Sequence, residues 1–535
     1  MLERVRRAAG GRHACSMDDR VAVDGRRYRG AGARRLMPLL VLLLCSVAAP
    51  THAERWRVTP TLGVNETLTD NVFLSSSNKT GDLVTAISPG IAINGEGDRA
   101  KLRLNYSFTE QLYVRETGSR NHQNNLNAIG SIEAIENLFF IDAYGTISQQ
   151  YLSAFGAVSP GGGNNNANVN NNSVETSSYS LSPYLKGRLL NWVDYLVRYR
   201  ATTTSSQSNL TNDLNSSEWS GALNGSTRWS HLTWTLDAMS LHNDYSGGRT
   251  YDASRYGLNL AYRFNPQIQV SLIGGRESND YVSLQQQSNF TRGLGVLWTP
   301  DLRTKLAASA QNRFFGTGYN VDFSHRRPRS AVTFRASRDV SFQPPGVGNT
   351  GQGSNYDAFY SIIAAANPGL PANDIAAQVT QLLQDRGIPA DGTVVNGYLT
   401  DRPNVNNLQQ LTAALIGARN TVTFIATRSE QQNLSLVNGL TNNYSLPDRI
   451  LQRGYGVIWS HRLTGISTLS LSINQQRSST YILNSPETET TGGYLLFSTS
   501  LSPNTTANIG ARRVVSSGVT SYTESALTGA IFHRF

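Results

Sequence analysis

Alternation of side chains with a period of two dominates this sequence from residue 54 to its end. Residues 256–264 read Tyr-Gly-Leu-Asn-Leu-Ala-Tyr-Arg-Phe, so every second side chain is large and apolar and those between are mostly small or polar. Residues 101–109 repeat the pattern. Successive side chains of a strand point to opposite faces, so each segment has one apolar face. About 22 such segments of about ten residues can be drawn, which predicts the spanning strands of a large membrane barrel.

The connections between these segments alternate in length. Short links fall at 136–137, 189–191, 265–266, 299–301, 326–329, 418–420, 464–465 and 502–504. Long ones fall between them at 151–178, 205–217, 243–255, 277–289, 340–406 and 429–450. Bacterial outer-membrane barrels have short periplasmic turns and long external loops. The sequence therefore predicts an all-β, single-chain transmembrane antiparallel barrel with long extracellular loops and both chain ends on the periplasmic side of a Gram-negative outer membrane.

Composition excludes the main rival classes. Charged residues make up 16% of the chain, against about 25% in soluble proteins. The mean hydropathy is −0.33 and no apolar run long enough for a spanning helix occurs beyond residue 50. Aromatic and β-branched residues are spread through the whole chain, which argues against long disorder. Most tryptophans lie near the chain start or a short link, where an interfacial aromatic girdle belongs.

Residues 1–53 are predicted to be a secretory signal peptide with an extended, arginine-rich beginning. Arg34 and Arg35 precede the apolar stretch 36–49, which is too short to span a bilayer. Thr51 and Ala53 are the small residues of a cleavage site before Glu54. This segment contains ten arginines and four acids, so it carries +6 of the net +10. The mature chain 54–535 is then only weakly basic, and its charge gives no reason to expect nucleic-acid binding.

Both cysteines, Cys15 and Cys45, fall within the predicted signal peptide. A mature chain without cysteine has no disulfide framework, no cysteine-ligated zinc and no covalently attached haem. The six mature histidines are scattered, and no protease, hydrolase or nucleotide-binding motif occurs. We therefore expect no enzyme activity, no cofactor and no metal site.

The last residues carry an assembly signal. Leu527, Gly529, Ile531, His533 and Phe535 alternate up to a terminal Phe. This ending resembles the last-strand signature of proteins inserted by the outer-membrane barrel-assembly machinery, although an aromatic residue often stands where this chain has His533. The resemblance implies that machinery and outer-membrane lipid as partners.

Two long connections have distinctive sequences. Residues 160–172 are rich in Gly and Asn and are expected to form a mobile external loop without a packed core. In the insertion 340–406, Ile375, Val379, Leu382 and Leu383 recur at helical spacing, with Asn373 or Asp374 as a cap and Gly387 as a stop. This predicts a short amphipathic helix that plugs the lumen, covers its mouth or lies on the rim.

The polar strand faces should line the lumen, because the apolar faces meet lipid. The basic residues assigned to the lumen are Lys101, Arg103, Arg198, Arg200, Arg263, Arg303, Lys305, Arg313 and Arg335, against the acids Glu133, Asp142, Asp194 and Asp237. Two interpretations stay open. The charges form an electrostatic path for anionic solutes or an acidic polymer, or they pair with one another and lie at strand ends.

A family resemblance rests on short motifs. Residues 66–72 (Glu-Thr-Leu-Thr-Asp-Asn-Val), residues 87–91 (Ile-Ser-Pro-Gly-Ile), the strand 102–106 and the late insertion 371–387 together resemble the outer-membrane β-barrel family associated with PEP-CTERM/exosortase systems and their exopolysaccharide gene clusters. The resemblance covers nearly the whole mature chain. It implies a barrel that serves exopolysaccharide export or surface assembly, and it brings no functional residues with it.

The sequence thus predicts an outer-membrane barrel acting as a porin-like pore in exopolysaccharide export or assembly. Polysaccharide and periplasmic export components would be its further partners. Two alternatives remain: a structural or adhesive surface barrel with a closed lumen, and a solute-uptake porin. Uptake with a separate plug domain is less favoured because no such domain precedes the first strand at Arg57.

Overall fold

The computed structural model describes the chain from Arg55 to Phe535, and the predicted signal peptide lies outside it. Within that range the description omits residues 117–119, 161–166, 170, 190–191, 209–210, 228–230, 247, 343–355, 357–358, 361–362, 365–374, 377, 380–394, 396, 401, 435–448 and 482–485. Among the described residues no helix is long and apolar enough to cross a membrane.

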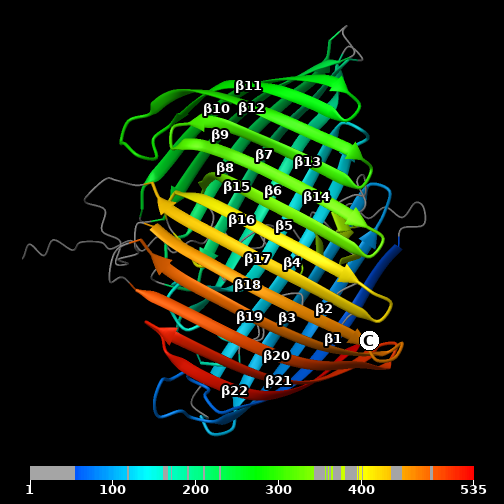
Figure 1. Ribbon diagram of the computed structural model, residues 1–535, viewed down its shortest axis with the longest axis vertical. Coiled ribbons are helices and arrows are strands. Elements are labelled where there is room, and N and C mark those ends of the chain that lie inside the picture. Colours follow the sequence, from blue (N-terminus) through cyan, green and yellow to red (C-terminus); the bar gives the residue numbers. More distant parts are fainter. Residues whose placement is uncertain are drawn as a thin grey trace, which may run out of the picture. The chain divides into compact units, whose positions relative to one another are not determined.

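The described residues between Arg55 and Phe535 include one antiparallel sheet of 22 strands that closes on itself. Each strand pairs with its neighbours in the sequence, and β1 also pairs with β22 between Thr61↔Arg534 and Thr69↔Ala526. Figure 1 shows the strands running obliquely around the wall in sequence order, from blue to red. The predicted all-β barrel of about 22 strands is therefore confirmed.

The strands are β1 (Arg55–Thr69), β2 (Asp82–Glu96), β3 (Ala100–Tyr113), β4 (Arg120–Ile135), β5 (Phe139–Tyr151), β6 (Ser173–Leu189), β7 (Val193–Ser206), β8 (Leu214–Ser226), β9 (Leu232–Tyr245), β10 (Thr250–Asn265), β11 (Ile268–Asn279), β12 (Gln287–Asp301), β13 (Thr304–Arg313), β14 (Gly316–Arg327), β15 (Ser330–Ser341), β16 (Asn404–Ile416), β17 (Asn420–Asn433), β18 (Arg449–Arg462), β19 (Ser467–Thr480), β20 (Glu487–Ser502), β21 (Thr505–Gly518) and β22 (Tyr522–Arg534).

The two faces of the wall differ as the alternation predicts. On β10 the exposed side chains are Tyr256, Leu258, Leu260 and Tyr262, and Ala261 on the other face is buried. Exposed apolar side chains of this kind recur on strand after strand and form a lipid-facing band. A closed barrel with such a band is the form in which strands cross a bilayer, because every strand edge is paired. The chain is therefore an outer-membrane barrel.

The connection lengths follow the predicted parity with two exceptions: the connection after β13 is only 314–315, and the predicted long connection 243–255 is reduced to 246–249 between β9 and β10. Turns after even-numbered strands are short, and the long connections follow odd-numbered strands, so both ends of the barrel chain lie at the short-turn end. One predicted link is displaced. Residues 299–301 continue β12, and the turn falls at 302–303, because a register shift between Trp298 and Asp301 accommodates Pro300, which has no backbone N–H.

The connection 152–172 does not stand free outside the barrel. Ser159, Ala167 and Asn168 are buried, and the backbone carbonyl of Phe155 accepts hydrogen bonds from Thr488 on β20 and from Thr520 beside β22. These partners are more than 330 residues away along the chain. The expectation of an unpacked external loop is wrong for the described part of 160–172, because Ala167 packs in a buried cluster with Val84 of β2 and Tyr113 of β3. Residues 161–166 and 170 lie outside the described residues.

Part of the insertion between β15 and β16 lies inside the barrel. Ile375, Ala376, Gln378 and Val379 are helical, as are five residues between Tyr356 and Ala364. Phe359, Ile375 and Val379 form a buried cluster with Ile425 and Ile458, which alternation places on the lumenal faces of β17 and β18. Of the three placements for the predicted helix, the structure has the lumenal one. Leu382, Leu383, Gly387 and the proposed caps lie outside the described residues.

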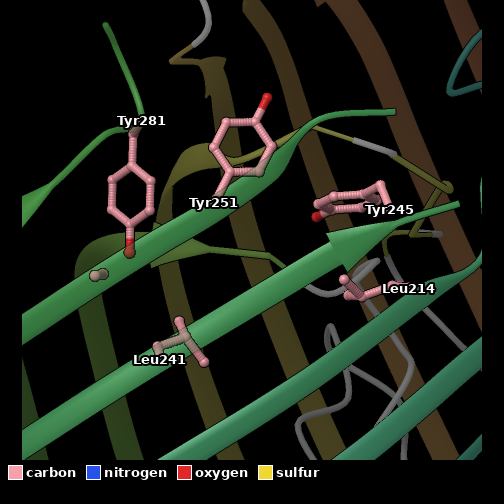
Figure 2. Packing of buried hydrophobic residues seen from close by; sticks show 6 residues of the cluster. Leu214, Leu241, Tyr245, Tyr251 and Tyr281 are labelled. Atoms are coloured by element: carbon pink, nitrogen blue, oxygen red, sulfur yellow. The ribbon is translucent and has the colours of Figure 1, made fainter. Parts of the chain in front are cut away.

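Aromatic side chains fill the long-loop end of β8–β11. Tyr245, Tyr251 and Tyr281 gather beside Leu214 and Leu241 (Figure 2). Ring centroids are 6.0 Å apart for Tyr245 and Tyr251 and 6.4 Å for Tyr251 and Tyr281. Burial raises the pKa of Tyr281, which lies in the β11–β12 connection, and keeps its phenol neutral. This cluster and the described parts of the two inward connections lie in the long-loop half of the lumen.

Candidate functional site

The candidate site is the lumenal wall of β5–β15, below the inward-folded connections. Cross-strand ion pairs line this wall. We call four of them the ion-pair belt: Arg198–Asp142 at 3.2 Å, Arg200–Glu218 at 3.6 Å, Arg255–Asp237 at 3.8 Å and Arg335–Asp322 at 3.3 Å. Each pair joins polar faces of adjacent or nearly adjacent strands. The belt alternates in sign and carries no net charge.

The ion-pair belt shows which of the predicted basic residues are neutralised by an acid. Arg198, Arg200 and Arg335 are each paired, and Arg103 lies 3.8 Å from Glu96. These four therefore follow the pairing interpretation and do not form a free cationic path. Their acidic partners include Glu218 and Asp322, which were not among the predicted lumenal residues. Both lie on the polar face of a strand next to an arginine, so strand register was the signal that would have found them.

Four predicted residues make no ion pair among the described residues, and one of them, Arg303, lies exposed in the β12–β13 turn and not on a strand face. Lys101, Arg263 and Lys305 have no ion pair among the described residues, and all three lie near the short-turn ends of β3, β10 and β13. Alternation places them on the lumenal face, opposite exposed apolar neighbours such as Tyr262 and Phe264. Among the predicted lumenal residues, the unpaired basic side chains on strand faces thus lie at the periplasmic end.

An aromatic and cationic stack extends the belt on β5–β7. The rings of Phe140 and Tyr184 stack with centroids 5.2 Å apart and planes 15° apart. The ammonium of Lys186 lies 4.0 Å from the Phe140 centroid, and the guanidinium of Arg198 lies 4.1 Å from that of Tyr184. These cation–π contacts hold a ring surface beside charged groups in the lumen.

A polar cavity of about 300 Å³ continues the site over β9–β14. Its polar lining includes Asp237, Arg255, Asn259, Gln269, Gln311 and Asn320. The Oδ1 atom of Asn259 is buried without a hydrogen-bond partner, so an acceptor is available there. Gly257 leaves room for the Asp237 carboxylate, since a Cβ at this position would lie 2.5 Å from Asp237 Oδ1.

Two ionic networks with largely buried arginines tie nearby strands together elsewhere on the wall. Arg313 donates to Glu277 at 2.7 Å and to Asp339 at 2.8 Å, which ties β11, β13 and β15 together. Arg512 and Glu524 pair at 2.7 Å between β21 and β22. Arg313 was predicted to line the lumen, and Glu277 and Asp339 neutralise its charge. The described residues contain no group of three or more His, Cys, Asp or Glu placed to hold a metal ion.

The predicted assembly signal lies at the closing seam. Ile531 and Phe535 are exposed on the outer face, and the backbone N–H of Phe535 donates to the Pro60 carbonyl of β1 at 3.0 Å. The His533 ring packs against Phe535 with centroids 4.6 Å apart and is hydrogen-bonded through Nδ1 to the Thr505 hydroxyl at 2.9 Å. The signal residues are therefore part of the seam itself.

Known proteins resemble this chain in architecture only. No family model and no curated protein matches the sequence. Solved structures similar to it include the FrpB iron transporter from Neisseria meningitidis (9% identity, TM-score 0.47, 89% of this chain and 81% of that chain) and BauA, the ferric preacinetobactin receptor from Acinetobacter baumannii (11%, 0.47, 89% and 80%). The siderophore receptor PirA from Acinetobacter baumannii is a third (9%, 0.46, 91% and 81%). At these values no residue role can be transferred.

Proposed function

We propose that this barrel is a solute channel of the outer membrane whose cargo is a saccharide. The observation that carries the proposal is the stack of Phe140 and Tyr184 beside the Arg198–Asp142 pair on the lumenal wall. A sugar ring has an apolar face that packs on an aromatic ring and hydroxyl groups that bond to charged side chains. A belt of balanced charge favours such a neutral, hydroxyl-rich solute over a simple anion.

The direction that fits best is uptake of a small saccharide. The connections 152–172 and 342–403 both pack inward in their described parts, and both would have to move for a continuous polymer to pass. A short solute needs only a transient opening. Export of exopolysaccharide is the second candidate, and it is favoured by the resemblance of residues 66–72 and 87–91 to barrels of exopolysaccharide gene clusters. Both candidates use the same chemistry at the wall.

Liposome swelling with reconstituted protein tests the proposal. Oligosaccharides should enter faster than uncharged polymers of equal size, and Phe140→Ala with Tyr184→Ala should remove that preference. Tyr199→Ala is the matched control, because the Tyr199 ring packs against exposed Trp219 on the outer face, with ring centroids 4.8 Å apart. If uptake is undetectable, the same assay is run after replacing 346–396 by a short linker. A folded deletion variant that still admits no saccharide would leave the closed structural barrel as the answer.

A further inference from the structure

An arginine ladder crosses three adjacent strands on the outer face of the barrel. Arg428 on β17 lies opposite Arg453 on β18, and Arg453 lies opposite Arg477 on β19. On β18 the neighbours of Arg453 on the same face are Tyr455 and Val457, which are exposed in the lipid-facing band. The intervening Gly454, Gly456 and Ile458 are buried. The ladder therefore faces the membrane and not the lumen.

The ladder lies at the external edge of that band. Arg453 is four residues from Arg449, the first residue of β18, and Arg477 is three residues from the end of β19 at Thr480. Both are on the side of the long connections, which face outside in this class of barrel. The three guanidinium groups are thus at the depth of the lipid headgroups of the external leaflet.

Like charges directly opposite each other on neighbouring strands destabilise a sheet, because their side chains are only about 5 Å apart. Here two such contacts follow one another. Flanking acids compensate only the ends: Arg428 lies 3.2 Å from Glu430, which also pairs with Arg449, and Arg477 lies 2.6 Å from Glu487. Glu489, the next residue in line, accepts a hydrogen bond from Gln475 at 2.6 Å.

The centre of the ladder has no such partner. The side chain of Arg453 makes no hydrogen bond or ion pair with any described residue, although it lies between two other arginines. Arg428 and Arg477 on either side are each held by a carboxylate, so the guanidinium of Arg453 is the donor group left for an external ligand. An anion with several acceptor oxygens would pair with it and would screen the repulsion among the three arginines.

The geometry points to a binding site for the phosphate group of a phosphorylated glycolipid of the external leaflet, held by Arg428, Arg453 and Arg477. Guanidinium groups bind phosphate through paired N–H donors, and a row of three matches an anion of multiple negative charge. The lipid chains would then lie along the apolar band below, beside Tyr455 and Ile473, both exposed. This surface is separate from the lumenal site, so its test is independent of the channel function.

The test is thermal unfolding of the purified barrel in detergent, followed by its heat-modifiable migration, with bisphosphorylated lipid A as the probe. Lipid A should raise the unfolding midpoint of the native protein by several degrees, and dephosphorylated lipid A and inorganic phosphate should not. The triple variant R428Q/R453Q/R477Q should bind lipid A at least tenfold more weakly, and R453Q alone should lose part of that affinity.

The matched control is R292Q. Arg292 is exposed on the outer face of β12 at a similar distance from the long-loop end, and its cross-strand neighbours are uncharged Gly274 and Asn312. It should bind lipid A as the native protein does. Without lipid, R453Q should unfold at a higher temperature than the native protein because a repulsion is gone. Equal protection by inorganic phosphate or by dephosphorylated lipid, or unchanged binding by the triple variant, overturns the proposal.

Discussion

Arg512 and Glu524 form a two-point ion pair inside the barrel, with Nη2–Oε1 at 2.7 Å and Nε–Oε2 at 3.1 Å. The Thr69 hydroxyl also donates to Oε1 at 2.9 Å. The Oδ1 atom of Asn168 accepts from Arg512 Nη2 at 3.5 Å, so the pair fastens the connection 152–172 to the wall formed by β21, β22 and β1. The pair is almost fully buried.

Glu524→Gln should destabilise the barrel strongly. The substitution leaves a buried guanidinium without its counter-charge, and the loss of one partner of a buried pair costs about 3–5 kcal/mol. The midpoint of heat-modifiable migration should fall accordingly. Asp194→Asn is the control, because the Arg188–Asp194 pair has a similar distance of 2.7 Å but is exposed. An equal fall in both variants would mean that burial of the Arg512 pair adds nothing.

The topology should be readable with single cysteines, since 54–535 contains no native thiol. Val519→Cys lies in the β21–β22 connection, and Val519 is exposed. Gly465→Cys lies in the β18–β19 turn, where an added Cβ meets no atom within 4 Å. An impermeant thiol reagent added to intact cells should label the first and spare the second. Reversed labelling would place the barrel upside down.

The free charges at the periplasmic end should give the channel a weak, salt-dependent anion preference. Lys101→Glu, Arg263→Glu and Lys305→Glu together should invert it, and both preferences should shrink as salt rises, because the screening length is about 10 Å at 0.1 M. Reversal potentials in planar bilayers measure this. Arg419→Glu, in the exposed β16–β17 turn, should leave selectivity unchanged. A preference insensitive to the three lumenal changes would assign it to another part of the wall.

Removal of Phe535 should slow assembly more than it lowers stability. Its side chain is exposed, and its backbone N–H makes one contact across the seam with Pro60. We expect less folded protein in the outer membrane, with little change in the unfolding temperature of the fraction that does fold. Quantitative fractionation of cells and heat-modifiable migration check the two halves of this expectation.

The mature protein should begin at Glu54 in mass spectrometry if residues 1–53 are cleaved.

The strands of the barrel wall could be predicted from the sequence, whereas the inward packing of the connections could not. The number of strands and the alternation of loop lengths can be derived from the period-two pattern. This pattern is local, because every second residue of a strand, such as Leu258 and Leu260, faces lipid. The inward course of 152–172 depends on partners such as Thr488 and Arg512, which are hundreds of residues away. Nothing in the local composition of a Gly- and Asn-rich segment specifies such partners.

The lumenal charges show the same limit. The sequence places Arg200 and Arg335 correctly on polar strand faces. It does not show that Glu218 and Asp322 on neighbouring strands neutralise them through ion pairs. The cross-strand register determines which charged side chains lie opposite each other and pair, and turn geometry sets that register. The helix around Ile375 was predictable from its spacing, whereas its docking on Ile425 and Ile458 required the closed sheet.

The pairing of β1 with β22 imposes an order on events. These two strands are the first and last of the wall, so the ring cannot be completed until the whole chain has been delivered. Until then two sheet edges with unpaired backbone groups stay open, and such edges invite pairing with other chains. The span between them makes their meeting slow, because loop-closure entropy and contact order both grow with separation. A cell that makes this protein must therefore shield an incomplete ring for as long as its final strand is missing.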